Sequence, residues 1–254
     1  MRFADAELTN DSFLDGRLSV HQPRSGYRAG VDPVLLAAAV PAVFGQKVLE
    51  LGCGVGVASL CLGQRVPGLH LTAVELQSDY ADLAGRNARD NGIQMDVVRA
   101  DLRSLPASLK AQGFDHIIAN PPYFSRSQGT SAQDTGRDIS LAGETPLADW
   151  ISVATQRLAP KGYLTLIQKA ERLAEVLSLT DQRLGGVTVL PLAPRNGRAA
   201  ELVIVQARKG GRGVFRLLSP LVLHEGDRHE RDGESYSPQV RAILRDGAAL
   251  SLKI

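Results

Sequence analysis

A regular alternation of short apolar runs with segments of helical periodicity constrains the fold of this chain most. The apolar runs have the length of buried strands, and they are Lys47–Leu51, 69–75, Met95–Arg99, Phe114–Ala119 and 163–168. Helical patterns separate several of them, at 57–66, 78–91 and 147–158, the last ended by Pro160 and Gly162. Strands that alternate with helices in this way build βαβ units. The sequence therefore predicts an α/β fold with a largely parallel sheet and helices on both faces.

The last third of the chain departs from this alternation. Two strand-like runs, 187–192 and 201–208, have only a short polar connection between them and no helix. Strands joined without a crossover helix pair antiparallel, so we expect an antiparallel pair at one edge of the sheet. A final helix is expected at 237–244, with Pro238 at its first position and Gly247 beyond its end.

A glycine-rich turn follows the first strand, with Gly52, Gly54 and Gly56 leading into the next helix. Glycines between a strand and a helix let backbone approach a ligand at a helix N-terminus. The third glycine comes one residue earlier than in the usual dinucleotide pattern, and the acid Glu50 would repel a phosphate. A zwitterionic ligand with an ammonium group suits the turn better, although a tight turn without any ligand is the alternative.

Polar residues follow the next three strands. Glu75 ends the second strand, where an acid can bind both hydroxyls of a ribose. Asp101 follows the third strand and is placed to contact an adenine amino group, although it can equally be a helix N-cap. Asn120 ends the fourth strand. Because the carboxyl ends of parallel strands share one edge, these side chains should converge on one crevice.

Asn120 begins the rigid turn Asn120-Pro121-Pro122-Tyr123. Each proline fixes its own φ and keeps the preceding residue out of the helical region. Such a turn can present the Asn120 side-chain oxygen and the Pro121 carbonyl as paired acceptors, with a flat ring beside them. That arrangement suits an amino group on a planar system, such as the exocyclic amine of adenine or a side-chain amide.

Composition adds a few bounds. The 254 residues carry a net charge of +2, so any nucleic-acid contact must come from local patches. Cys53 and Cys61 have no metal-ligand spacing, no histidine pair has it either, and no metal is expected. No signal core or membrane-length apolar run occurs, and we expect a cytoplasmic protein without membrane contact.

Together these motifs resemble the class I methyltransferase family, specifically its amino-methylating branch. The flanks narrow the resemblance to the bacterial tRNA1(Val) (adenine-37-N6)-methyltransferase family. They are 26–38 (GYRAGVDPVLLAA), 221–225 (LVLHE) and 236–240 (YSPQV). The resemblance implies a Rossmann-like fold with a seven-stranded, mostly parallel sheet, formed by residues 46–254 and preceded by an N-terminal extension, 1–45, packed on it. It also implies S-adenosyl-L-methionine (AdoMet) as cofactor and an RNA partner, the tRNA of that family's name.

The resemblance also implies a set of site residues. The catalytic group is Asn120, Pro121, Pro122 and Tyr123, with Tyr123 stacking on a rotated base. The cofactor group is Glu50, Gly52, Cys53, Gly54, Gly56, Glu75, Leu76, Asp101, Leu102 and Asn120. Residues 125–144 are expected to cover the target, and the segment 208–213 with Arg17, Arg24 and Arg28 to grip phosphates, the alternative being solvated charge. A glutamine-N5 protein methyltransferase, a guanine-N2 RNA methyltransferase and a non-catalytic AdoMet-binding module are the other hypotheses.

Overall fold

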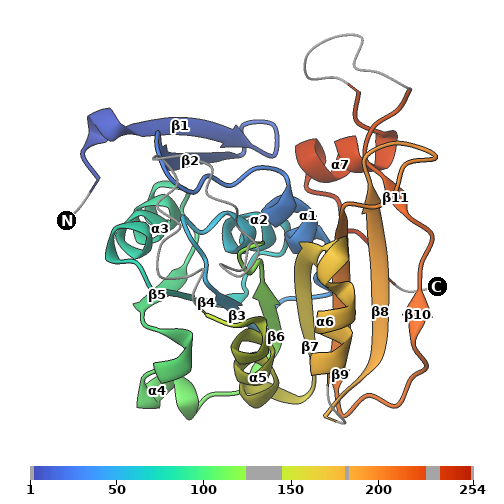
Figure 1. Cartoon of the computed structure of the whole chain (residues 1–254). Helices are drawn as coiled ribbons and strands as arrows, with labels where there is room; N and C mark the ends of the chain where they lie inside the picture. The colour runs from blue at the N-terminus through green and yellow to red at the C-terminus, as the bar shows by residue number, and fades with distance from the viewer. Residues whose placement is uncertain (1–2, 124–144, 181–182, 227–234, 253–254) are drawn as a thin grey trace, which may run out of the picture.

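A computed structural model describes residues 3–123, 145–180, 183–226 and 235–252 of the chain. Its centre is one sheet of nine strands in the order β10-β8-β9-β7-β6-β3-β4-β5, with β11 also paired to β8 (Figure 1). The strands are β3 (Lys47–Leu51), β4 (His70–Glu75), β5 (Met95–Arg99), β6 (Phe114–Ala119), β7 (Leu158–Lys169), β8 (Leu184–Ala193), β9 (Leu202–Lys209), β10 (Arg216–Leu217) and β11 (Leu221–Val222).

The strands from β3 to β7 run parallel to one another, as the sequence predicts. β9 is antiparallel to both of its neighbours, β7 and β8, which confirms the antiparallel pair near one edge. The predicted count of seven strands is wrong by two. β10 and β11 are two-residue strands that run along the outer edge of β8. Segments this short carry no alternation of apolar and polar residues, and therefore no sequence signal.

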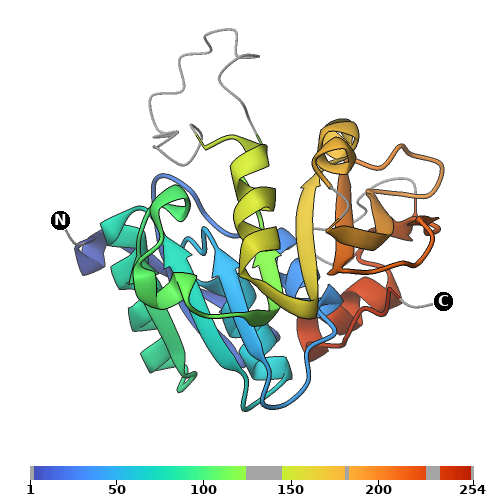
Figure 2. The same cartoon turned by 90° about the horizontal axis from the view of Figure 1, so that it is seen from below.

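Helices cover both faces of the sheet (Figure 2). One face carries α1 (Asp32–Ala39), α2 (Val57–Arg65), α3 (Ser78–Asp90) and α7 (Pro238–Asp246), and the other carries α4 (Ala107–Lys110), α5 (Leu147–Arg157) and α6 (Leu173–Leu179). Successive strand residues point to opposite faces. Val48 and Ile118 accordingly join the first of the two large hydrophobic cores, and their neighbours Leu49 and Ile117 join the second. None of the described helices has the length and apolar character needed to cross a membrane.

The predicted cause of one helix end, the stop of the helix that begins at residue 147, is wrong. α5 ends at Arg157 and β7 begins at the next residue, so Pro160 and Gly162 lie inside the strand and do not stop the helix. The first part of β7 pairs with β6 across an irregularity in register. A Cβ atom at Gly162 would lie 2.9 Å from the Asp115 carbonyl oxygen, so glycine allows the two strands to approach there.

The N-terminal residues form a short helix η1 (Asp5–Glu7), a hairpin of β1 (Leu8–Phe13) and β2 (Leu18–Pro23), and then α1. The hairpin lies against α3 (Figure 1). The Asn87 side chain accepts a hydrogen bond from the His21 N–H at 2.9 Å and donates one to the His21 carbonyl at 3.0 Å. The Asn91 side chain makes the same pair of bonds with the Ser19 backbone. The mostly polar β1 gives little strand signal, which is why the sequence predicts no hairpin.

Candidate active site

Four chain segments leave the sheet together at the carboxyl ends of its parallel strands. Leu51, the last residue of β3, pairs with Val74 of β4 on one side and with Ala119 of β6 on the other. Glu75 in turn pairs with Arg99 at the end of β5. The structure therefore brings the glycine turn, Glu75, the segment from Asp101 and the Asn120 turn together at the carboxyl ends of the parallel strands.

The glycine turn requires its glycines for conformation and for space. Gly52, Gly54 and Gly56 have φ angles of +63°, +54° and +90°, which side chains other than glycine rarely adopt. A Cβ atom at Gly52 would lie 2.4 Å from the Trp150 ring, and one at Gly54 would lie 3.1 Å from the Tyr27 ring. The turn is therefore held between α5 and the N-terminal segment. Gly56 is the N-cap of α2.

Two buried carboxylates flank this turn. Glu50 is 3% exposed and accepts hydrogen bonds from the Ser59 amide and hydroxyl, which ties β3 to α2. Glu75 is 5% exposed and accepts the N–H groups of Gly54 and Gln77, both at 2.9 Å. Burial raises the pKa of Glu50 to about 7 and also raises the pKa of Glu75, while these hydrogen bonds partly oppose the shift.

Neither carboxylate has a cationic partner among the described residues. Buried acids without a counter-charge are unfavourable, and a ligand that carries positive charge relieves them. AdoMet carries an ammonium and a sulfonium group, so the two acids fit it better than they fit a phosphate ligand. The two buried acids and the glycine turn therefore suit AdoMet.

Asp101 occupies the position that its alternative interpretation predicted, the N-cap of the 3-10 helix η2 (Leu102–Ser104). Its carboxylate accepts the Arg103 N–H at 2.8 Å and forms an ion pair with the Arg103 guanidinium at 2.6 Å. The hydrogen bond and charge of Arg103 lower the pKa of Asp101. A contact to adenine would have to be made alongside these bonds, and it stays a prediction.

The remaining predicted cofactor residues are hydrophobic or small. Cys53 is buried, its N–H donates to the Val74 carbonyl at 3.0 Å, and burial raises the pKa of its thiol. Leu102 is buried within the segment that follows β5, and Leu76 is half-buried after β4. Within the described ranges, no three His, Cys, Asp or Glu side chains are grouped so that they could hold a metal ion.

The turn that begins at Asn120 is held at three of its four residues. The Pro121 carbonyl accepts a long 3.5 Å bond from the Gln168 side chain, and the Pro122 carbonyl accepts a 3.3 Å bond from Arg172. The Tyr123 hydroxyl donates to another element, at the start of α1. No hydrogen bond joins the Asn120 side chain to any other residue that the structure describes. The turn is thus braced by its neighbours while the Asn120 amide stays available.

The basic residues expected to grip phosphates contact their own chain. Arg208 donates to the Lys161 carbonyl at 3.1 Å and lies over the Tyr163 ring, and Lys209 donates to the Leu158 carbonyl at 2.6 Å. Their partners lie towards the amino ends of the parallel strands. The segment 208–213 therefore lies at the end of the sheet opposite the glycine turn.

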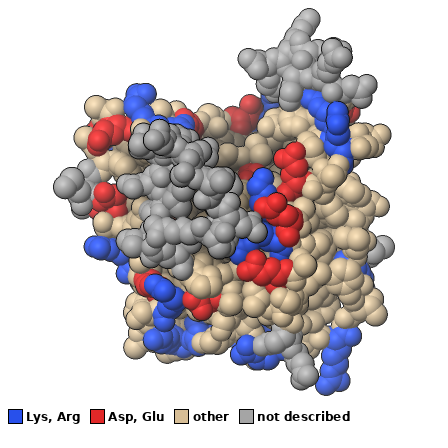
Figure 3. Space-filling view, viewed as in Figure 1, with Lys and Arg blue, Asp and Glu red and all other residues tan. Residues whose placement is uncertain are grey.

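The N-terminal arginines are also engaged within the chain. Arg17 donates to the Asp246 carbonyl, Arg24 to the Ala6 carbonyl, and Arg28 pairs with Asp11. The predicted cover, 125–144, lies outside the described residues. Acidic and basic side chains are interleaved on the face in Figure 3, in keeping with the small net charge.

The sequence missed several residues that shape this edge. Gln168 and Arg172 follow the same rule that found Glu75 and Asn120, because both lie at or just beyond the carboxyl end of a parallel strand. Trp150 and Tyr27 enclose the glycine turn from distant segments, and no local pattern marks them.

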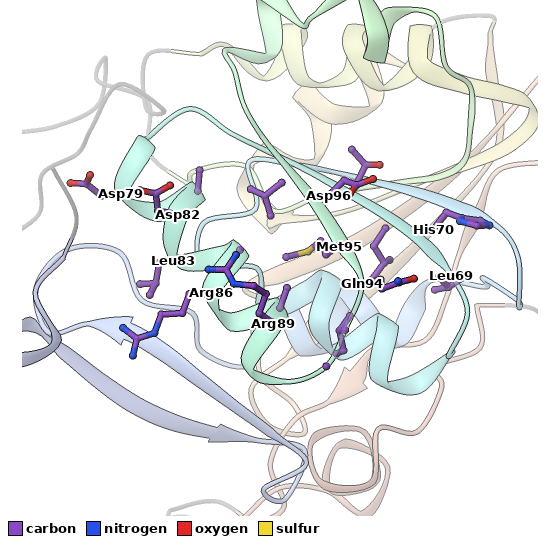
Figure 4. Close-up of a pocket in the computed structure, with 18 of the residues that line it drawn as sticks. Leu69, His70, Asp79, Asp82, Leu83, Arg86, Arg89, Gln94, Met95 and Asp96 are labelled. Carbon is purple, nitrogen blue, oxygen red and sulfur yellow. The ribbon is translucent and has the colours of Figure 1, made fainter.

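A wide hollow elsewhere on the surface is not part of this site. It lies between α3 and the outer strand β5, and Arg86, Arg89, Met95 and Asp96 are among its lining residues (Figure 4). None of the predicted site residues lines it. Arg86 in its lining is paired with Asp5 at 2.6 Å.

Three features define a class I methyltransferase that uses AdoMet. They are a parallel sheet with an antiparallel strand next to its edge, a glycine turn after the first parallel strand, and acids at the ends of the strands that follow. Comparison with known proteins agrees. Residues 29–191 match the Methyltransferase small domain family, and the chain belongs to that family.

Individual relatives and one solved structure extend the comparison. The chain is similar to tRNA1(Val) (adenine(37)-N6)-methyltransferases. The Porphyromonas gingivalis protein is 33% identical over 72% of this chain and 77% of its own, and the Aeromonas hydrophila protein is 29% identical over 86% and 91%. A crystal structure of a predicted O-methyltransferase, protein Atu636 from Agrobacterium tumefaciens, is 26% identical with a TM-score of 0.71. It covers 88% of this chain and 100% of its own.

Proposed function

We propose that this protein transfers the methyl group of AdoMet to the exocyclic N6 amine of adenine in a tRNA. The observation that carries the proposal is the placement of Asn120. It follows β6, the strand directly beside β3, so its amide leaves the sheet next to the glycine turn. Its amide is free of partners within the described chain, whereas the turn around it is braced.

The chemistry assigned to these residues is polar stabilisation of an amine. AdoMet supplies an activated methyl group when it is bound, and Glu50, Glu75 and the glycine turn would hold it. The exocyclic amine of adenine is a weak nucleophile because its lone pair is delocalised into the ring. The amine can donate one hydrogen bond to the Asn120 side-chain oxygen and another to the Pro121 carbonyl. These two bonds favour a pyramidal nitrogen and stabilise the positive charge that develops on it.

The long Gln168 contact leaves room for this role of Pro121. A carbonyl oxygen has two lone pairs, so it can accept from Gln168 and from a substrate amine together. Tyr123 would supply a ring face to the base, which has to leave its stack to reach the turn.

The RNA substrate is supported by the relatives, whose names specify adenine 37 of tRNA1(Val). Guanine N2 in RNA and glutamine N5 in a protein remain the alternatives, since an amide oxygen beside a planar amine serves all three. The name of the solved structure specifies oxygen as the methyl acceptor. The proline-rich turn favours nitrogen, because its paired acceptors match an NH2 group.

The test is methyl transfer from labelled AdoMet to unmodified tRNA, with the product digested to nucleosides and analysed by mass spectrometry. Nucleosides of tRNA from a deletion strain provide the matching cellular measurement. N6-methyladenosine that forms in the assay and is missing from the deletion strain supports the proposal. N2-methylguanosine, a ribose-methylated nucleoside or methylglutamine in a protein fraction would each replace it with the corresponding acceptor.

A further inference from the structure

Tyr123 is bound by a residue far away in the sequence. Its hydroxyl donates to the Asp32 carboxylate at 2.6 Å, across a separation of 91 residues. The Lys169 ammonium lies 5.5 Å from the centre of the same ring, within the range of a cation–π contact. The ring is therefore held between the first turn of α1 and the end of β7.

Asp32 is a fixed anchor. It is the first residue of α1, and all seven residues that follow it in the helix are buried. Arg65 from α2 binds the other end of the helix, with bonds of 3.0 and 2.6 Å to the Ala37 and Val40 carbonyls. An acid in the first turn is also stabilised by the helix dipole. The carboxylate thus has little freedom to move away from Tyr123.

The hydroxyl of Tyr123 stays a donor. Burial and the neighbouring Asp32 charge raise the pKa of Tyr123 well above its usual value, so it remains neutral at any working pH. A neutral phenol and a carboxylate form a charge-assisted hydrogen bond, which is shorter and stronger than a bond between neutral groups.

We propose that Asp32 is a positioning residue for methyl transfer, which acts by fixing the plane of the Tyr123 ring through their hydrogen bond. The inference rests on the proposed function in one respect, the role of Tyr123 as the surface on which the base stacks. A ring that is free to rotate would hold the base less often beside Asn120, and a small misplacement of a reacting group is costly in rate. Asp32 itself touches neither reactant in this role.

The experiment is a double-mutant cycle with Asp32→Ala and Tyr123→Phe, measured as single-turnover methyl transfer to tRNA. Tyr123→Phe keeps the ring and removes the bond, so each single variant should slow transfer by roughly ten- to a hundredfold, the scale of one hydrogen bond to a charged group. The double variant should be no slower than the slower single variant. Asp32→Asn, which retains an acceptor oxygen, should lie between the wild type and Asp32→Ala.

Two control variants lie at the other edge of the sheet. Tyr163→Phe removes a hydroxyl from a ring that stacks on His116, and Asp115→Ala removes a carboxylate that accepts the Lys47 N–H at 2.9 Å. Both should leave the transfer rate unchanged, although Asp115→Ala should lower the thermal midpoint. Affinity for AdoMet, measured by calorimetry, should stay at the wild-type value in the Asp32 and Tyr123 variants.

A second readout needs no substrate. In protein labelled with fluorotyrosine, the 19F resonance of residue 123 is assigned by its loss in Tyr123→Phe, and Asp32→Ala should shift or broaden it. Multiplicative rate losses in the cycle, or an unchanged resonance in Asp32→Ala, would overturn the positioning role. Failure of the wild type to methylate tRNA would instead count against the proposed function, and the resonance would still decide the role of Asp32.

Discussion

Asn120 is the residue on which the chemistry depends most. Replacing it with alanine removes an acceptor that matters chiefly in the transition state, so kcat should fall by about 10²-fold or more. AdoMet affinity should stay near the wild-type value, since the glycine turn and its acids are untouched. Single-turnover transfer to tRNA measures the rate. Asn91→Ala is the control, because it removes an amide that binds Ser19 far from the site and should affect stability alone. Transfer by Asn120→Ala at the wild-type rate would exclude the residue from the mechanism.

Gly54 should be intolerant of any side chain. With φ at +54° and the Tyr27 ring 3.1 Å from the position of a Cβ atom, Gly54→Val introduces strain and displaces groups beside the ligand. We expect AdoMet binding to be lost in calorimetry. Gly45→Val separates strain from ligand contact, because Gly45 also has a positive φ but faces open space. Equal losses of affinity in both variants would mean that strain alone is responsible.

Glu50 should make the stability of the ligand-free protein depend on pH. Its pKa is about 7 in the folded protein and 4.5 as the reference value, so the folded state retains a proton that the unfolded state releases. The contribution to stability is therefore present below pH 4.5 and is lost as the pH rises towards 7, by about 3 kcal/mol at most. Glu75 shifts in the same direction. Denaturant titrations from pH 5 to 7.5 should show this fall, and Glu50→Gln should reduce it. A pH dependence unchanged by Glu50→Gln would contradict this origin.

At the scale of elements, the segment 208–213 and the end of β7 should behave differently towards RNA. Removing the charges of Arg208, Lys209 and Arg212 should leave the salt dependence of tRNA binding unchanged, because the first two bind backbone carbonyls at the edge opposite the glycine turn. Lys169→Gln, beside Tyr123, should reduce the slope of log affinity against log salt by about one. A flatter slope in the triple variant would show instead that RNA extends around to that edge.

At the scale of the whole molecule, we propose that the N-terminal extension belongs to the same folding unit as the sheet. Leu8, Leu18 and Val20 of the hairpin are buried in the core shared with α2 and α3. Deleting residues 1–24 should therefore lower the free energy of unfolding by more than about 3 kcal/mol, since each such side chain contributes about 1.5–3 kcal/mol. Asn87→Ala, which removes the bonds of that side chain to His21 and to the Val55 carbonyl, should cost less. Chemical denaturation measures both, and an unchanged midpoint for the deletion would make the hairpin an independent appendage.

The sequence by itself determined the parallel sheet, the glycine turn and the convergence of Glu75, Asp101 and Asn120 on one edge. These follow from local patterns, because strand and helix periodicities fix the elements and parallel strands place their carboxyl ends together. It did not predict the hairpin, whose strand β1 is mostly polar. It also did not predict β10 and β11, whose two residues each carry no apolar alternation.

Only the tertiary structure decided which distant residues meet. The bond between Tyr123 and Asp32, the packing of Trp150 against Gly52, and the placement of Arg208 at the far edge all join segments with no shared local signal. Such contacts depend on how whole faces of the sheet and helices are buried against one another. Burial rewards apolar area without regard to sequence separation, so a local pattern fixes each element but not its distant neighbours.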